Sequence, residues 1–100
     1  MTEQRGESAD CVGPVLEANE TSRALVAAII KTNSAVVVHD RGSYLRVLVP
    51  RRCVLSRAAI EAELGRAFHL PGDLESLMPS YKGTVRMTGD EVSWSWKVPS

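Results

Sequence analysis

Two histidines and two cysteines are the nitrogen and sulfur ligands that this 100-residue chain could offer a transition metal. A carboxylate-bridged diiron centre needs Glu-x-x-His spacing on helices. The residue three positions before His39 is Val36, and the residue three positions before His69 is Arg66. A zinc site would need closely spaced cysteine and histidine ligands, and the sequence contains no such cluster. We therefore expect no bound metal, flavin or haem.

Other kinds of chemistry find equally little support. Cys53 with a histidine could form a nucleophile pair, but its Val-Leu surroundings beside a strand end favour a structural thiol. The segment that begins at Gly65 lacks the glycine pattern and the Lys-Ser/Thr of a phosphate-binding loop. Trp94 and Trp96 could stack on single-stranded nucleic acid, but such platforms come with a basic groove. Both rings share a strand face with Val92, which predicts core or half-buried packing instead.

The composition favours one compact domain without a nucleic-acid or membrane partner. With 44% apolar residues, a chain of this length can bury enough surface to fold without metals or disulfides. Twelve basic residues balance twelve acidic ones. Such a balance provides no overall field to attract nucleic acid or an anionic membrane.

The cysteines and the N-terminus indicate the compartment and the domain boundary. Cys11 and Cys53 lie far apart and show no short repeat spacing, which argues against a disulfide scaffold and fits a cytoplasmic protein. Residues 1–11 are polar and charged, and no run in the chain approaches the roughly 18 apolar residues of a membrane span. We expect a disordered tail over residues 1–11 and a single domain over residues 12–98.

A first helix is predicted over Asn19 to Asn33, where apolar residues recur at helical spacing. Asn19 or Thr21 can cap its start. Residues 15–16 before the helix and the β-branched run 36–38 after it are typical of strands. Strand, helix and strand form a βαβ unit, whose crossover should be right-handed if the strands are parallel.

The middle of the chain is predicted to hold a strand and a second helix. Residues 40–43 form a turn, and residues 44–50 alternate in the manner of a strand. Ser56 precedes a short helix over Arg57 to Leu64, with Gly65 just past its end.

The last third of the chain is predicted to be a long loop followed by a hairpin. Residues 66–82 show no sustained period, and a loop of this length is unusual in a compact domain without a use for it. Residues 84–98 alternate on both sides of a turn at 88–90. The predicted fold class is α+β: two helices packed on a mostly antiparallel sheet, with the βαβ unit and a C-terminal hairpin.

Four short segments in order resemble a known family. They read Val-Gly-Pro-Val-Leu at 12–16, Asp-Arg-Gly-Ser-Tyr-Leu-Arg at 40–46, Leu-Gly-Arg-Ala-Phe at 64–68 and Asp-Glu-Val-Ser-Trp at 90–94. This order resembles the effector, or coupling, proteins of soluble diiron monooxygenases, which regulate methane, phenol, toluene and alkene hydroxylases. The resemblance runs from Val12 to Trp96. In structural terms, residues 40–42 should set a turn and Phe68 should fill the core.

The resemblance implies a cofactor-free regulatory subunit that is not itself an enzyme. Such a protein would bind the hydroxylase of a multicomponent diiron monooxygenase. It would tune the active site, substrate access and the coupling of oxygen activation to hydroxylation or epoxidation. A reductase and a ferredoxin would complete the expected system.

The resemblance also implies where the hydroxylase would be met. The expected contacts are the end of the first helix and the segment before the penultimate strand. The residues are Asn33, Leu77, Met78, Ser80, Tyr81 and Lys82. Pro79 and Lys82 stand where relatives tend to have small or apolar residues, which suggests partner specificity. Tyr81 has two readings, an interface anchor or an edge of the core.

A different class of function stays open from the sequence. A small stand-alone enzyme or hydrophobic-ligand carrier would have a cavity between helices and sheet, with residues 66–82 as its lid. Binding of a small hydrophobic molecule by the isolated protein would favour that alternative.

Overall fold

A computed structural model of the protein describes residues 10–96, which form helices and short strands. In chain order they are β1 (Cys11–Glu17), α1 (Glu20–Thr32), β2 (Val37–Asp40), β3 (Tyr44–Pro50), β4 (Arg52–Ser56), α2 (Arg57–Leu64), α3 (Gly72–Glu75), β5 (Ser80–Lys82), β6 (Thr84–Met87) and β7 (Glu91–Ser95). The buried Cys11 already belongs to β1, so the folded part starts one residue before the predicted boundary. Residues 1–9 of the predicted tail and residues 97–98 of the predicted domain lie outside the described residues.

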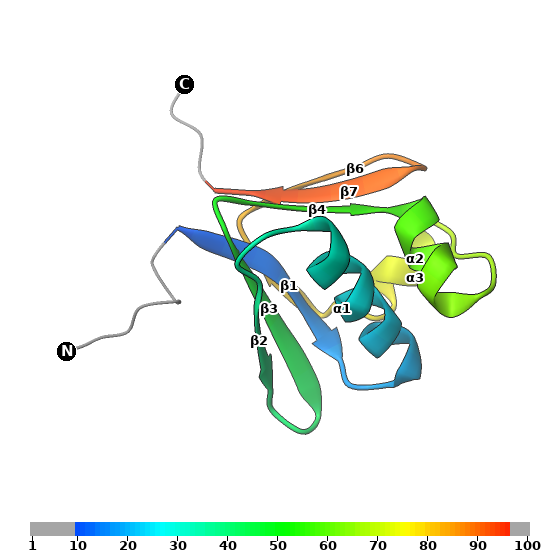
Figure 1. The fold of residues 1–100 in the computed structure, drawn as a ribbon, viewed down its shortest axis with the longest axis horizontal. Helices are drawn as coiled ribbons and strands as arrows, with labels where there is room; N and C mark the ends of the chain where they lie inside the picture. Colours follow the sequence, from blue (N-terminus) through cyan, green and yellow to red (C-terminus); the bar gives the residue numbers. More distant parts are fainter. Residues whose placement is uncertain (1–9, 97–100) are drawn as a thin grey trace.

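The described strands form two antiparallel sheets, where the sequence predicted one. The first sheet has the order β2-β3-β1-β5, and the second has the order β4-β7-β6 (Figure 1). The chain passes between the sheets three times. From β4 to β5 it runs through α2 and α3. The other two passages each use a single residue with positive φ: Arg51 between β3 and β4, and Gly83 between β5 and β6. Strands that change sheets need such a sharp bend.

Gly83 shows why one of these bends needs glycine. Its φ is 108°, and a Cβ atom there would lie 2.8 Å from both the carbonyl oxygen of Ser95 and a methyl carbon of Val12. Any side chain at this position would therefore collide with Val12 of β1 and Ser95 of β7. Arg51 accomplishes the other bend with φ at 67°, at a residue type that does not signal it in the sequence.

The predicted βαβ unit is confirmed, with one strand inserted. Both β1 and β2 pair antiparallel with β3, so they run parallel to each other on either side of it. The helix α1 connects them and packs against α2 and β4. The predicted C-terminal hairpin is also confirmed as β6 and β7.

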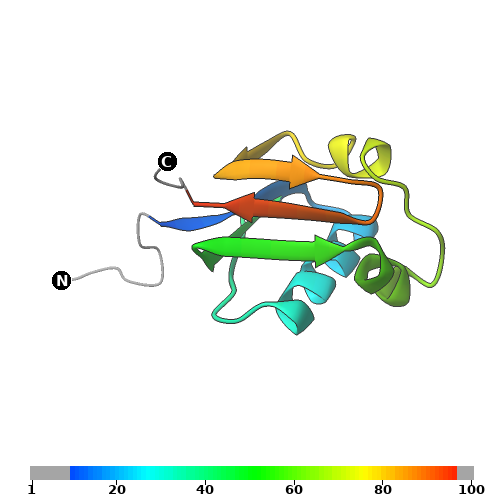
Figure 2. The same ribbon diagram turned by 90° about the horizontal axis from the view of Figure 1, so that it is seen from above.

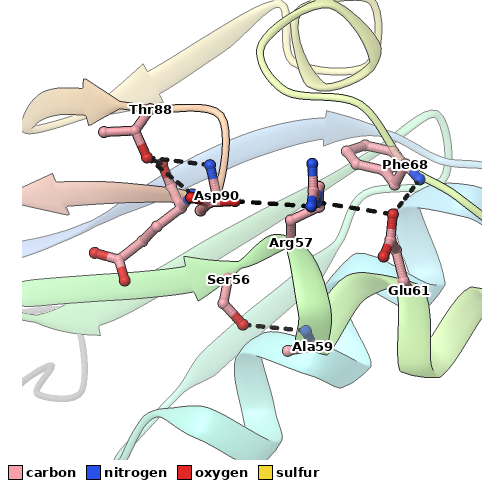
Figure 3. Close-up of polar contacts among 8 residues, drawn as sticks. Ser56, Arg57, Ala59, Glu61, Phe68, Thr88 and Asp90 are labelled. Carbon is pink, nitrogen blue, oxygen red and sulfur yellow. Dashed lines mark hydrogen bonds and ion pairs between the residues drawn. The ribbon is translucent and has the colours of Figure 1, made fainter.

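Local capping explains why the helices begin and end as predicted. The side chain of Asn19 accepts a hydrogen bond from the backbone N–H of Ser22 at 2.8 Å. Ser56 does the same for Ala59 at 3.0 Å (Figure 3). Gly65 ends α2 in the left-handed region with φ at 74°. Each cap satisfies backbone groups that the helix end leaves open.

The segment after α2 is tied back to that helix. A carboxylate oxygen of Glu61 accepts a hydrogen bond from the backbone N–H of Phe68 at 2.9 Å (Figure 3). The Phe68 ring is buried, as predicted. The turn at residues 40–42 is confirmed as well: the Gly42 N–H donates to Asp40 at 2.9 Å. That bond, aided by the charge of Arg23, holds the pKa of the Asp40 carboxyl below its usual range.

The predicted loop over residues 66–82 contains two elements that the sequence did not indicate. The four-residue helix α3 buries Leu74, and the three-residue strand β5 pairs with β1. Neither is long enough to display a period. The segment is therefore an integral part of the fold.

The core lies between the two sheets and the helices. Its fully buried members, each with 0% exposed surface, are Val12, Leu16, Leu25, Ile29, Val47, Cys53, Leu55, Ile60, Leu74, Val92 and Trp94. Trp96 exposes 39% of its surface and belongs to the exterior. Within residues 10–96, no helix is long and apolar enough to cross a membrane.

Candidate functional site

A groove of about 460 Å³ opens on the face of the first sheet that is turned away from the core. Strands β1, β3 and β5 form it. It is lined by Gly13, Val15, Tyr44, Arg46, Val47, Leu48, Ser80, Tyr81 and Lys82. Three of these, Ser80, Tyr81 and Lys82, are predicted partner-binding residues.

Strand register brings the lining residues together. Val15 lies opposite Arg46 of β3 on one side and opposite Ser80 of β5 on the other. Gly13, two residues earlier on β1, lies opposite Lys82. Because side chains alternate along a strand, these residues share one face of the sheet.

Gly13 keeps part of the groove floor bare. A Cβ atom at this position would lie 2.3 Å from the carbonyl oxygen of Val47, and φ is 149°. No other residue fits without moving β1 away from β3. The hollow beside Lys82 is therefore built into the backbone.

The charge of the groove is positive. Arg46 and Lys82 are its charged lining residues, and no acidic side chain lines it. Neither cation has an ion pair within residues 10–96. By contrast, Arg23 pairs with Asp40 at 3.4 Å and Lys31 pairs with Glu63 at 2.6 Å.

Two exposed tyrosines lie at the groove, one on its face and one at its β5 edge. Tyr81 exposes 45% of its surface and Tyr44 exposes 39%. Tyr81 belongs to β5, the edge strand of the sheet, and pairs with Pro14 of β1. Its side chain therefore points to the opposite face from Ser80 and Lys82, and its ring lies at the edge of the sheet beside the groove. This exposure removes Tyr81 from the core and leaves its ring open to a partner.

Leu77 and Met78, the other two predicted contacts before β5, hold this part of the chain in place. Leu77 and Met78 are half-buried and pack against the core. The Leu77 carbonyl also accepts a hydrogen bond from the Glu17 N–H at 2.9 Å. These two residues therefore anchor the chain just before Ser80, Tyr81 and Lys82 reach the groove.

Asn33, the other predicted contact, lies elsewhere and is engaged internally. Its side-chain amide donates to the Val54 carbonyl at 2.8 Å and accepts from the Val54 N–H at 3.0 Å. These bonds join the end of α1 to β4. Figure 2 shows α1 beside β4 and β6 at the opposite edge of the second sheet, and β5 leads directly into β6. The structure does not bring Asn33 together with Tyr81.

The residues first considered for chemistry are not gathered in one place. His39 is half-buried on β2, and His69 is exposed in the segment after α2. Both cysteines are buried, and burial raises the pKa of the Cys53 thiol to about 12. Cys53 is therefore protonated, and not nucleophilic, at neutral pH. Among residues 10–96, no three His, Cys, Asp or Glu side chains cluster as metal ligands would.

Sequence reasoning did not identify Val15, Tyr44 and Arg46 as site residues. A signal was present, because the alternation along residues 44–50 placed Tyr44 and Arg46 on one face. The missing information was the pairing of that strand with β1, and of β1 with β5.

Comparison with known proteins identifies the family. The model of the MmoB/DmpM family matches residues 10–95. The chain is 40% identical over 88 residues, 86% of each chain, to a protein of Xanthobacter autotrophicus described as the effector subunit of an alkene monooxygenase system.

Solved structures agree with this fold. A chain in a phenol hydroxylase–regulatory protein complex matches with a TM-score of 0.77 and 23% identity, over 87% of this chain and 98% of that one. Soluble methane monooxygenase regulatory protein B matches with a TM-score of 0.68 and 20% identity, over 96% of this chain and 72% of that one. On the match of the family model and the 40% identical relative, this chain belongs to the MmoB/DmpM family.

Proposed function

We propose that this protein is the effector subunit of a multicomponent monooxygenase and that it binds the hydroxylase component. The observation that carries this proposal is the 40% identity to an alkene monooxygenase effector subunit over 86% of both chains. A reductase and a ferredoxin are expected as further components of the system.

The mode of action follows from binding thermodynamics. A protein that supplies no chemistry can change an enzyme only by preferring one of its conformations over another. A coupling of roughly 1–3 kcal/mol changes such an equilibrium by about 5- to 150-fold. That range is enough to reshape an active site or to control the entry of substrate.

The proposal includes a non-catalytic role for this chain. The Cys53 thiol is buried and its pKa is raised, so it is not an activated nucleophile, which supports that role. The alternative, a ligand carrier with residues 66–82 as its lid, would need that segment to move as a unit. Burial of Leu74 and pairing of β5 with β1 oppose such motion.

We assign the hydroxylase contact to the groove and its β5 edge. Ser80, Tyr81 and Lys82 would make the contact, and Leu77 and Met78 would hold them in position from the core side. An exposed tyrosine on a firmly anchored edge is typical of residues that dominate interfaces. For Asn33 we propose a positioning role, because Val54 engages its amide.

The test measures the affinity of Tyr81→Ala for the hydroxylase encoded with this protein. An interface anchor worth about 2 kcal/mol or more predicts at least roughly 30-fold weaker binding. Trp96→Ala is the matched control, since Trp96 is another exposed aromatic ring and lies outside the groove. Its affinity should stay within about threefold of the parent protein.

Two results would count against the proposal at different levels. A parent protein that neither binds the hydroxylase nor changes its turnover would refute the effector role. A folded Tyr81→Ala variant with unchanged affinity would refute the β5 edge as the contact surface and leave the effector role intact.

A further inference from the structure

We infer that the groove recognises a carboxylate-bearing segment of the hydroxylase, held between Arg46 and Lys82. This inference rests on the proposed function and specifies the chemistry of the partner surface. The observation behind it is the pair of cations that face the same hollow without an ion pair in the described part of the chain.

Strand geometry lets the two cations act on one occupant. Arg46 on β3 and Lys82 on β5 lie on either side of β1, on the same face of the sheet. Two strand spacings separate their backbones sideways by about 10 Å. Both side chains are long enough to reach inward over the bare position at Gly13. A carboxylate bound there would meet a planar guanidinium fork and an ammonium.

The rest of the lining favours an occupant that is acidic and apolar together. Val15 contributes apolar surface, and Tyr44 contributes a partly exposed ring. The exposed ring of Tyr81 lies beside the groove, at the β5 edge. A volume of about 460 Å³ accommodates a few side chains. An acidic residue next to an aliphatic or aromatic one would satisfy both kinds of surface.

A polyanion is a poorer fit than a protein segment. Binding to nucleic acid draws on many phosphate contacts, whereas this groove offers two cations and the whole chain has a formal net charge of zero. A carboxylate needs only the two groups that are present.

Charge reversal tests the inference in the intact protein. Arg46→Glu and Lys82→Glu should each weaken hydroxylase binding by at least about 10-fold, the loss expected for one charge-assisted hydrogen bond. The matched control is Arg86→Glu on β6, an exposed arginine that lies outside the groove and has no ion pair within residues 10–96. Its affinity should stay within about twofold, and unfolding midpoints should establish that all three variants are folded.

The possible outcomes separate the two proposals. If the parent protein binds and both groove reversals bind equally well, the carboxylate inference is wrong and the effector role stands. If Arg86→Glu weakens binding as much as the groove reversals, overall charge is responsible and the inference is also wrong. If the parent protein does not bind at all, the effector role itself fails.

Zero-length cross-linking identifies the partner group directly. A carbodiimide joins an amine to a carboxylate only when the two are in contact, so it should link Lys82 to an Asp or Glu of the hydroxylase. Lys31 and Glu63, 2.6 Å apart, provide an internal positive control for the reaction. Lys82→Arg keeps the charge, so it should lose the cross-link and keep affinity within about threefold.

Mass spectrometry of the cross-linked complex gives the decisive result. A saturated complex that forms the Lys31–Glu63 link without any link from Lys82 to the hydroxylase would overturn the inference. Competition between the hydroxylase and a single-stranded oligonucleotide for the groove would overturn it as well.

Discussion

The predicted contact residues lie at one edge strand of each sheet: Asn33 contacts β4, and residues 80–82 form β5. The chain uses these two edges differently. At β4, the side chain of Asn33 supplies both a donor and an acceptor to the backbone of Val54. At β5, the edge has β1 as its one neighbouring strand in the sheet, and Tyr81 exposes 45% of its surface.

The difference separates structural from functional use of an edge. Unpaired backbone groups at a sheet edge invite other chains, and proteins usually cover or shorten such edges. This protein covers the middle of the β4 edge, at Val54, with the amide of Asn33. It leaves the β5 edge open beside a positively charged groove, where a partner is useful.

The largest expected effect tests the core that supports both edges. Trp94 is fully buried on β7, opposite Cys53 of β4 and Val85 of β6. Trp94→Ala should lower the free energy of unfolding by about 3–5 kcal/mol, because it loses burial and leaves a cavity. Trp96→Ala, at an exposed ring, should cost under about 1 kcal/mol. Chemical denaturation measures both, and similar losses in the two variants would contradict the assignment of Trp94 to the core.

The next effect tests the closed edge. Asn33→Ala leaves the Val54 N–H without its side-chain partner and the Val54 carbonyl with only the Thr32 hydroxyl at 3.5 Å, which should cost about 1–3 kcal/mol of stability. Hydroxylase affinity should change by less than about threefold in the folded variant. Ser34→Ala, at the exposed neighbouring position, is the control and should have little effect on either quantity. Lost affinity at full stability would restore Asn33 as a direct contact.

Sequence reasoning succeeded where the cause of a structure is local. The predicted second helix, Arg57–Leu64, has the predicted bounds because Ser56 and Gly65 act within one turn of the helix ends. The number of sheets was missed because it depends on the bend at Arg51, a residue type that rarely adopts positive φ. The strand β5 was missed because its three residues are held by β1, far away in the sequence.

The same distinction applies to the site. Ser80, Tyr81 and Lys82 were predicted from the resemblance to a family, and they line the groove. Arg46 was not predicted, since only the register of β3 with β1, and of β1 with β5, places it near Lys82. Periodicity assigns a residue to a face, but pairing between distant strands decides which faces join.

A smaller effect, on the pH dependence of stability, tests the burial of Cys53 on β4. Burial raises the pKa of Cys53, next to Val54 on β4, to about 12 from an ordinary value of 9.0. Above pH 9 the unfolded chain releases the thiol proton and the folded chain keeps it, so stability falls as the pH rises from about 9 towards 12. Between pH 8 and pH 10 the loss should be about 1.4 kcal/mol. Cys53→Ala lacks this thiol, so its decline over the same interval should be smaller by that amount. Equal declines would mean that the β4 edge admits water to Cys53.

The smallest effect distinguishes how the two edges work. Asn33 acts through polar atoms that contact backbone groups, whereas Tyr81 is proposed to act through the area of its ring. Tyr81→Phe keeps the ring and removes one hydroxyl, so hydroxylase affinity should fall by no more than about fivefold, which is roughly 1 kcal/mol. Stability should be unchanged, because the side chain is exposed. Titration of the hydroxylase with the Phe and Ala variants side by side separates ring from hydroxyl. If Tyr81→Phe binds as weakly as Tyr81→Ala, the hydroxyl is the recognised group and the open edge, like the closed one, depends on a polar contact.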